Sequence, residues 1–356
     1  RIGFLVVDEA HHIGQARAGN RMAYAHIDRA IARLGNPCVL ALTATADAQC
    51  AQAIEETLGC HHRVLDRTER KNLVLDDQRN LKQSDPYLAN LVSQGAKMVI
   101  YVNSRRHSVA LARSLRKRVP QMAPFIGFYN AGLARPDRCR VEELFRTGQL
   151  TVLVSTSAFG EGVNIPDIRH VVLYHMPFNE IEFNQMSGRA ARDGKEAVVH
   201  LLFSATDARI NEGILADATP NHDTLAQVYR ELKRLSAEAG GSPLRVSDAD
   251  LAQICSDRQP ALRMSQDSVA CAIAVFRELG LVEAEVSATQ GEHRLIRLIE
   301  AHGNKAELTD SVRYREGLDE IEIFRTFCHW VGSATAPVLQ SRIIRPILPD
   351  ESQEEV

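Results

Sequence analysis

Short apolar runs alternate with amphipathic helix patterns over the first two-thirds of the chain. Helix patterns such as "HSVALARSLRKR" (107–118) and "PDRCRVEELFRTG" (136–148) separate the apolar runs. This alternation predicts an α/β fold with a parallel sheet. The runs are apolar on both faces, as in strands buried between helices. They cover residues 2–7, 38–45, 97–104, 123–130, 150–157, 170–177 and 197–204.

The pattern changes after about Ala205. Residues 221–239 predict an amphipathic helix that ends at the glycine pair 240–241. "VSDADLAQI" then predicts a helix with Ser247 as N-cap and Asp250 at the capping-box position. The next helix pattern runs from its N-cap, Ser265, to Gly280.

"LVEAEVSATQGEHRLIRLIE" (281–300) predicts two strands joined by a turn around Gln290-Gly291. Helix, helix and hairpin together outline a winged helix. Residues 311–332 form one more helix pattern, and the tail "DESQEEV" is acidic and expected to be disordered. Residues 65–80 are polar without a clean period, which predicts a linker.

Composition narrows the class of protein. A chain of 356 residues suggests two or three domains. Its net charge of −3 gives no global basic field, so any nucleic-acid surface must be local. The seven cysteines form no CxxC pair, which argues against a zinc ribbon or a disulfide framework and favours reduced, cytosolic thiols. No apolar run approaches a membrane span of about 20 residues.

"VVDEAH" (6–11) places Asp8 and Glu9 after a buried strand, at the end where α/β sheets bind ligands. The aspartate can hold Mg²⁺ through water, and the glutamate can orient or deprotonate an attacking water. An acidic helix start, favoured by the helix dipole, explains this stretch equally well.

Two further stretches carry hydroxyl and basic groups. Thr43 and Thr45 in "LTATA" can hydrogen-bond the acidic loop, although threonines are common in strands and that simpler explanation is favoured for this stretch alone. Ser104, Arg105 and Arg106 begin a basic helix pattern, where free N–H groups favour a phosphate. The more distal basic residues of this helix are explained by a solvated face.

The loop 155–172 contains Gly160 and Gly162, and glycines let the backbone approach a ligand closely. "EIEFNQMSGRAARDG" (180–194) is more informative. Gln185, Arg189 and Arg192 share one helical face and suit charge on a transferring phosphoryl group. Complementing the helix dipole explains Arg192 but not the Gly-Arg-Ala-Ala-Arg spacing.

In this order, the stretches resemble the motifs of superfamily 2 helicases of the RecQ-like branch. The resemblance covers about residues 1–210, and the winged-helix outline extends it to about residue 300. "VVDEAH" resembles motif II, "ALTATA" motif III and "VIYVNSR" motif IV. "YNAGL" (129–133) is similar to a Tyr-His-Ala-Gly-Leu segment of RecQ helicases. "VSTSAFGEGVNIPDIRHVVLYHMP" and "QMSGRAARDG" resemble motifs V and VI.

The resemblance implies ATP and Mg²⁺ as cofactors, no zinc, and DNA as partner. Asp8 would handle Mg²⁺, Glu9 would be the catalytic base and His11 would couple the nucleotide to Gln185. Arg192 would be the arginine finger, with Arg189 beside it. Other nucleotide-site residues would be Gly160, Gly162 and Asn164. Residues at the single strand would be Thr43, Thr45, Asn103, Ser104, Arg105, Thr156 and Ser157, of which the two motif III threonines would also transmit the nucleotide state.

Several features depart from the family pattern. The stretch after motif II holds only Tyr24 as an aromatic, the four-cysteine zinc module is missing, and Ala191 replaces a usual glycine. Residues 314–349 resemble the end of long bacterial proteins in which a RecJ-type exonuclease is joined to a helicase. No GxxxxGK[ST] loop occurs in the chain. In the family this loop precedes motif II, so the chain is expected to be a fragment that binds ATP poorly and does not hydrolyse it.

The sequence thus predicts RecA-like parallel-sheet lobes, the first one partial, followed by a winged helix and a helical C-terminal region. The expected activity is that of an ATP-dependent 3′–5′ DNA helicase in repair or recombination, in the cytoplasm and off the membrane, acting on single strands and duplex junctions mainly through phosphates. Alternatives are a non-enzymatic DNA clamp, an RNA helicase of the DEAH type and a helicase module fused to an upstream single-strand exonuclease. The expected parts are the end of lobe one (1–66), a linker (67–80), lobe two (81–215), a helical connector (216–243), a winged-helix-like domain (244–302), a helical extension (303–349) and a disordered tail (350–356).

Overall fold

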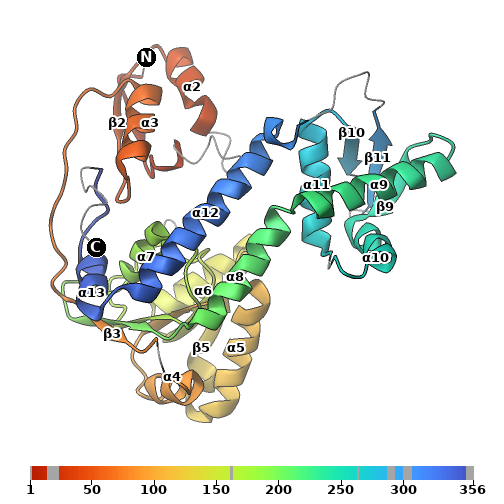
Figure 1. Cartoon of the computed structure of the whole chain (residues 1–356). Helices are drawn as coiled ribbons and strands as arrows, with labels where there is room; N and C mark the ends of the chain where they lie inside the picture. The colour runs from red at the N-terminus through yellow and green to blue at the C-terminus, as the bar shows by residue number, and fades with distance from the viewer. Residues whose placement is uncertain are drawn as a thin grey trace. The chain divides into compact units, whose positions relative to one another are not determined.

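The computed structural model describes residues 2–13, 24–79, 81–160, 163–262, 264–286, 293–299 and 307–349. The chain forms two compact units (Figure 1). The first unit comprises Arg1–His11, Asp28–Asn211 and Phe324–Val356, and the second comprises His12–Ile27 and Glu212–Ile323. The predicted α/β class with a parallel sheet is confirmed in the first unit, where parallel strands alternate with helices.

A six-stranded parallel sheet forms the centre of the first unit, in the order β3-β8-β7-β4-β6-β5. Strand β4 lies between β6 and β7, so that Met98 pairs with both Val152 and His170. The apolar runs of lobe two supply five of these strands, which confirms their prediction. The strands are β3 Leu73–Asp77, β4 Met98–Tyr101, β5 Ile126–Tyr129, β6 Val152–Ser155, β7 His170–Leu173 and β8 Ala197–Leu201.

Capping side chains fix where the helices around this sheet begin. The Ser104 hydroxyl accepts the His107 N–H and starts α5, and the Asn179 side chain accepts the Glu182 N–H and starts α7. The helices are α4 Ser84–Ser93, α5 Arg105–Arg118, the 3₁₀ helix η2 Pro120–Phe125, α6 Arg135–Arg146 and α7 Glu180–Ser187.

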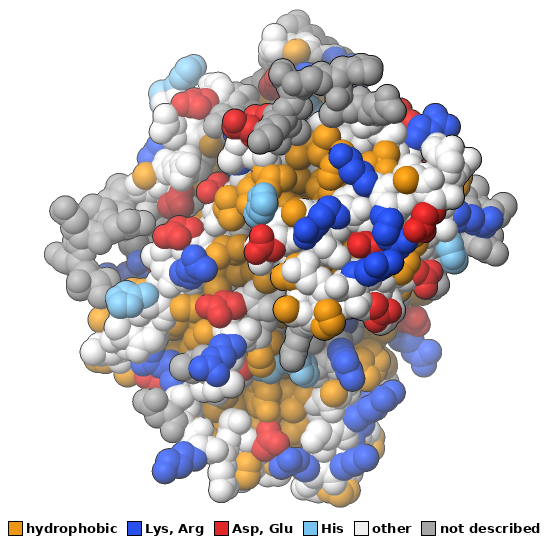
Figure 2. Space-filling model, turned by 45° about the vertical axis from the view of Figure 1, so that its right-hand side comes forward, with side chains coloured by type: hydrophobic (Ala, Val, Ile, Leu, Met, Phe, Trp, Pro, Cys, Tyr) orange, Lys and Arg blue, Asp and Glu red, His pale blue; other side chains and the backbone are white. Residues whose placement is uncertain are grey.

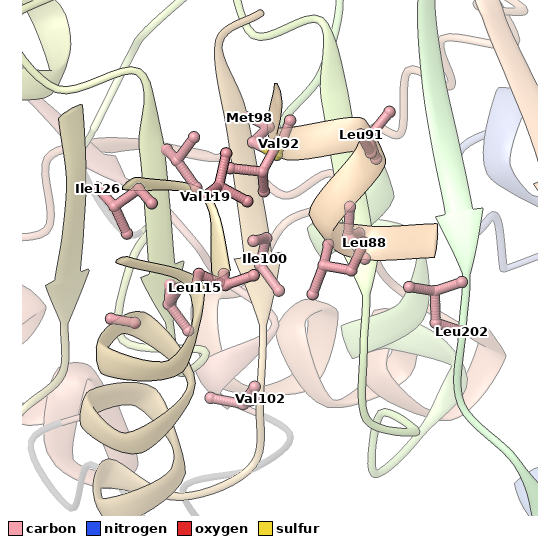
Figure 3. Packing of buried hydrophobic residues seen from close by; sticks show 14 residues of the cluster. Leu88, Leu91, Val92, Met98, Ile100, Val102, Leu115, Val119, Ile126 and Leu202 are labelled. Carbon is pink, nitrogen blue, oxygen red and sulfur yellow. The ribbon is translucent and has the colours of Figure 1, made fainter. Parts of the chain in front are cut away.

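A buried apolar core joins α4 and α5 to the sheet. Figure 3 shows Leu88 and Leu115 pointing toward Ile100 on the central strand. All three are almost completely buried, and burying an aliphatic side chain of this size contributes about 1.5–3 kcal/mol. This core packs the helices against the sheet, whose strands end in the loops that carry the predicted site residues.

One prediction about lobe two is wrong, because the expected linker 67–80 contains strand β3. β3 pairs in parallel with β8, from Leu73 opposite Ala197 to Asp77 opposite Leu201. It is an edge strand in which only Leu73 is fully buried, so its sequence lacks the continuous apolar run of the central strands. Its polar end is satisfied locally, since the Arg79 guanidinium donates to Asp77.

A smaller parallel pair belongs to lobe one. β1 (Phe4–Val7) pairs with β2 (Cys38–Ala41), both shorter than their predicted runs. One face of the pair remains open, with Phe4 55% and Val6 49% exposed. The helices in this part of the sequence are η1 Tyr24–His26, which belongs to the second unit, α2 Ile27–Arg33 and α3 Ala48–Leu58, the last capped by the Asp47 side chain.

The second unit contains the expected order of helix, helix and hairpin. Ser247 and Ser265 cap their helices as predicted, and Gly280 follows the second helix with φ +65°. The unpredicted strand β9 completes an antiparallel sheet in the order β10-β11-β9. The predicted turn at 290–291 lies outside the described residues, and the winged-helix assignment stays a prediction. The elements are α9 His222–Glu238, β9 Leu244–Ser247, α10 Asp248–Arg258, α11 Gln266–Glu278, β10 Val282–Val286, β11 His293–Leu298 and η3 Leu308–Asp310.

Two helices lie at the C-terminal end, and α8 (Ala205–Ala218) follows β8. The predicted helix 311–332 is present as α12 (Val312–Ser333), followed by α13 (Ala336–Ile344). α13 packs against β3 and α7 of the first unit (Figure 1). The expected disordered tail, 350–356, lies outside the described residues.

The surface matches the near-neutral composition. On the face drawn in Figure 2, Lys and Arg side chains are interspersed with Asp and Glu side chains. None of the helices among the described residues is both long and apolar enough to cross a membrane.

Candidate nucleotide and nucleic-acid site

The acidic loop of lobe one follows directly on β1. The Glu9 N–H donates to Asp8 Oδ1 at 2.9 Å, and Glu9 adopts φ +50°. Glu9 Oε2 lies 3.4 Å from His11 Nδ1, and the His11 side chain is buried while that of Glu9 is 44% exposed. The two carboxylates therefore stand at the carboxyl end of a strand, as predicted, with oxygen chemistry that suits Mg²⁺ and a water.

A chain of hydrogen bonds leads from this loop to lobe two. His11 Nδ1 bonds Thr43 Oγ1 at 3.1 Å, and the Thr45 N–H donates to the same hydroxyl at 3.2 Å. The Gln185 Nε2 then donates to Thr45 Oγ1 at 3.3 Å. The structure thus joins His11 to Gln185 through two threonines. Thr45 is 1% exposed, so its side chain lies inside this path and not on an open DNA-facing surface.

Arg189 and Arg192 follow α7 and line a shallow hollow with Phe159, Val163, Ile165 and Ile168. The Arg192 Nη1 donates to Asn164 Oδ1 at 3.5 Å, which brings the predicted Asn164 to the same place. Burial lowers the pKa of Arg192, and the neighbouring Arg189 and Arg70 guanidinium groups lower that pKa further. Glu9 acts in the opposite direction. Crowded cations of this kind favour an anionic ligand such as a polyphosphate.

The missing side chain of Gly160 leaves space for the Arg189 guanidinium group. A Cβ at this position would lie 2.7 Å from Arg189 Nε, and Gly160 has φ +147°, which L side chains rarely adopt. The sequence predicted that this glycine admits a ligand, whereas in the structure it admits a guanidinium group. Its companion Gly162 lies outside the described residues.

Replacing Gly160 by alanine is expected to lower the free energy of unfolding by about 1–3 kcal/mol, from backbone strain and from the displaced Arg189. Gly148→Ala is the matched control, because Gly148 has φ +78° and a Cβ there would meet nothing within 4 Å. Chemical denaturation of both variants measures the difference. Equal losses would show that Arg189 does not press on Gly160.

Sequence reasoning missed two residues that shape this site. Arg70 Nη1 donates to the Gly188 carbonyl at 2.7 Å, and its other Nη donates to the Ala190 carbonyl. The Asn72 Nδ2 donates to the Ala191 carbonyl at 2.8 Å. In the sequence, Arg70 and Asn72 appear only as a basic residue and an amide residue in a predicted linker, and nothing else there indicates their contacts.

These bonds hold the loop in which Ala191 replaces the family's glycine. Ala191 has φ +56°, a conformation that costs a non-glycine residue about 1–2 kcal/mol. Its N–H donates to the Ile168 carbonyl at 3.1 Å, and its side chain is buried. The loop therefore keeps the left-handed backbone conformation that glycine favours, and Ala191 adopts it with backbone strain.

The remaining predicted residues gather at one end of the lobe-two sheet. Strands β4 and β6 are neighbours, with Tyr101 opposite Ser155, so the residues that follow them share one edge. Arg105 and Ser157 are exposed there. Ser104 caps α5, and the Asn103 side chain is engaged internally, donating to the Met176 carbonyl at 2.6 Å. Thr156 follows β6 and is part-buried.

Comparison with known proteins finds helicases. Residues 83–194 match the family model of the helicase conserved C-terminal domain. The chain is 33% identical over 241 residues to a probable ATP-dependent DNA helicase RecS of Bacillus subtilis, covering 65% of this chain and 47% of that protein. It is 30% identical over 210 residues to the ATP-dependent DNA helicase RecQ of Haemophilus influenzae, covering 58% and 33%.

Among solved structures, the Mycobacterium smegmatis helicase Lhr bound to ssDNA and AMP-PNP matches with a TM-score of 0.46 and 16% identity, covering 83% of this chain and 41% of that one. The chain spans about half the length of RecS and a third of RecQ. The motifs, the helicase C-terminal domain at residues 83–194 and these relatives together support a RecQ-like superfamily 2 helicase.

Proposed function

We propose that this chain is the part of an ATP-dependent DNA helicase that supplies motifs II to VI, moves 3′ to 5′, and acts in DNA repair or recombination. The hydrogen-bonded path from His11 through Thr43 and Thr45 to Gln185 carries the proposal. It joins the loop that carries Asp8 and Glu9 on one lobe to α7 on the other, and Arg189 and Arg192 follow α7, as a nucleotide held between two lobes requires.

Bound ATP with Mg²⁺ would supply the phosphoryl transfer that drives the cycle. Asp8 would hold the ion through water, and Glu9 would orient and deprotonate the attacking water. Arg192, with Arg189 beside it, would neutralise charge that develops on the transferred group. The path to Gln185 would report the presence of nucleotide to lobe two.

DNA is the proposed partner at the lobe-two edge formed by the ends of β4 and β6. The exposed Arg105 and Ser157, together with Ser104 at the start of α5, offer a cation and hydroxyls but no base-reading shape. Such contacts suit phosphates and therefore tracking without sequence preference. Preference for single strands at duplex junctions and residence in the cytoplasm belong to the same proposal.

Single-stranded DNA is expected to bind this chain with affinity that falls steeply as salt rises. Replacing Arg105 by alanine should weaken binding and reduce the slope of log K against log salt by about 0.7, the value for one lost single-strand phosphate contact. Fluorescence anisotropy with a labelled oligonucleotide over a salt series measures both. Arg146→Ala on the exposed side of α6 is the control. An unchanged slope in Arg105→Ala would remove this residue from the DNA surface, and a duplex RNA competitor of equal strength would favour the RNA helicase alternative.

By itself the chain is proposed to lack ATPase activity, because its sequence contains no GxxxxGK[ST] loop to cradle the phosphates. The second candidate, a non-enzymatic DNA clamp, is favoured by the same exposed lobe-two edge. The two differ in whether Arg192 matters for function.

A further inference from the structure

The lobes are joined covalently by a thin connection. Residues 60–70 have no helix or strand, and most are exposed, with Val64 at 95%. An exposed coil of this length permits many orientations of the domains at its ends. The contact between Thr45 and Gln185 therefore needs another element to hold the lobes in register.

The C-terminal segment 336–347, which we name the interlobe strap, is firmly anchored on lobe two. The Leu75 N–H donates to Gln340 Oε1 at 2.6 Å, and Gln340 Nε2 donates to the Leu73 carbonyl at 2.8 Å, so this amide pairs with the free edge of β3. Leu339 is fully buried and Ile343 nearly so. Arg342 forms an ion pair of 2.6 Å with Glu180 of α7.

The same strap is tied to α7 next to Gln185. The Asn184 Nδ2 donates to the carbonyls of Arg342 at 2.9 Å and Arg345 at 2.8 Å. These carbonyls lie at the end of α13, where a helix leaves acceptors unsatisfied. Asn184 directly precedes Gln185 in the chain. It therefore ties the end of the strap to α7 beside the last residue of the hydrogen-bonded path.

The far end of the strap reaches motif III in lobe one. Ile347 forms a parallel β-bridge with Thr45, and the Ala46 N–H donates to the Ile347 carbonyl at 3.3 Å. On the way, the Arg70 N–H donates to the Ile344 carbonyl at 2.8 Å, and Arg345 pairs with Glu69 at 2.8 Å. One segment therefore touches lobe two, the interlobe connection and Thr45.

We propose that the interlobe strap is a positioning element that holds Thr45 against the Gln185 helix and so sets the separation of the two halves of the site. Ile347 and Asn184 act as positioning residues through Thr45 and Gln185. The end of the strap at lobe one is held by the β-bridge and the buried side chain of Ile347, whereas its end at lobe two has many contacts. When the strap lets the lobes separate, the Ile347 contact therefore breaks first and α13 stays on lobe two. The link to nucleotide turnover rests on the proposed function, but the positioning itself does not.

The test measures the distance between lobes without nucleotide or DNA. Spin labels on the exposed Cys38 of β2 and Cys139 of α6 report the separation by pulsed electron spin resonance. The background replaces the part-exposed Cys50, Cys60 and Cys328 by alanine. The parent chain is expected to give one narrow distance distribution.

Truncation after Arg345 removes Ile347 but keeps α13, and it is expected to broaden the distribution at least twofold. Truncation after Pro349 is the control and should leave it narrow. Ile347→Asp, which places a charge at a buried position, should broaden it, while Ile347→Val should not. Circular dichroism confirms that each variant is folded. A broad distribution in the parent, or an unchanged one after truncation at Arg345, overturns the proposal.

The outcome is independent of the proposed function. If the strap variants broaden the distance distribution but Arg192 proves irrelevant to ATP turnover, the positioning role of the strap is supported and the proposed nucleotide site is wrong. If Arg192 is essential but the strap variants leave the distance distribution unchanged, the nucleotide site is supported and the positioning role of the strap is wrong.

Discussion

Arg192→Ala is expected to lower kcat for DNA-stimulated ATP hydrolysis by about 10³-fold, measured in a form of the protein that carries a phosphate-binding loop. The guanidinium lies in a part-buried cluster with Arg189 and Arg70, where removing one cation leaves developing phosphate charge less compensated. Since its contact forms with the transferring group, KM for ATP should change far less than kcat. A steady-state assay with and without single-stranded DNA measures both constants.

The same variant separates the two functional candidates. A helicase that couples ATP to movement should lose unwinding with Arg192→Ala, whereas a passive DNA clamp should keep all of its DNA binding and any strand separation. Arg146→Ala serves as the matched control, because Arg146 is an exposed arginine of lobe two that forms a surface ion pair with Glu143. Full unwinding by Arg192→Ala would falsify the helicase proposal.

Glu9→Gln is expected to lower kcat by about 10²–10⁴-fold while leaving nucleotide affinity within a few-fold of the parent. Glutamine keeps the size of the side chain, but it cannot take a proton from water. Glu9 is partly open to solvent and close to His11, as a residue that meets a water must be. The measurements are steady-state hydrolysis and the binding of a fluorescent, non-hydrolysable nucleotide analogue.

Glu56→Gln on the exposed side of α3 is the control for Glu9→Gln, with the same chemical change on the same lobe. Equal loss in both variants would point to a general effect of charge on lobe one. Loss of analogue binding in Glu9→Gln alone would instead assign this carboxylate to holding the nucleotide, and the role of catalytic base would be wrong.

The lobe-two strands were predictable from sequence because their burial leaves a local trace. β4, β6 and β7 are buried on both faces, so their apolar runs are continuous, and the helix starts at Ser104, Ser247 and Ser265 follow from a hydroxyl that caps N–H groups three residues on. β3 was missed because an edge strand carries polar residues such as Asp76 and Asp77 without penalty.

Some residues of the site could be predicted from the sequence, and others could not. Asp8, Glu9, Gln185 and Arg192 have spacings that indicate their chemistry. Arg70 and Asn72 act on backbone carbonyls about 120 residues further along the chain, and carbonyls leave no mark in a sequence. The interlobe strap was equally invisible, since Gln340 and Ile347 find their partners only through the fold.

The amide of Gln340 also has a consequence for solubility. β3 ends the six-stranded sheet, and an unprotected sheet edge recruits strands from other molecules. By occupying both the N–H of Leu75 and the carbonyl of Leu73, Gln340 fills the positions that an intruding strand would use. Versions of the chain that end before α13 would expose this edge and are expected to self-associate into aggregates.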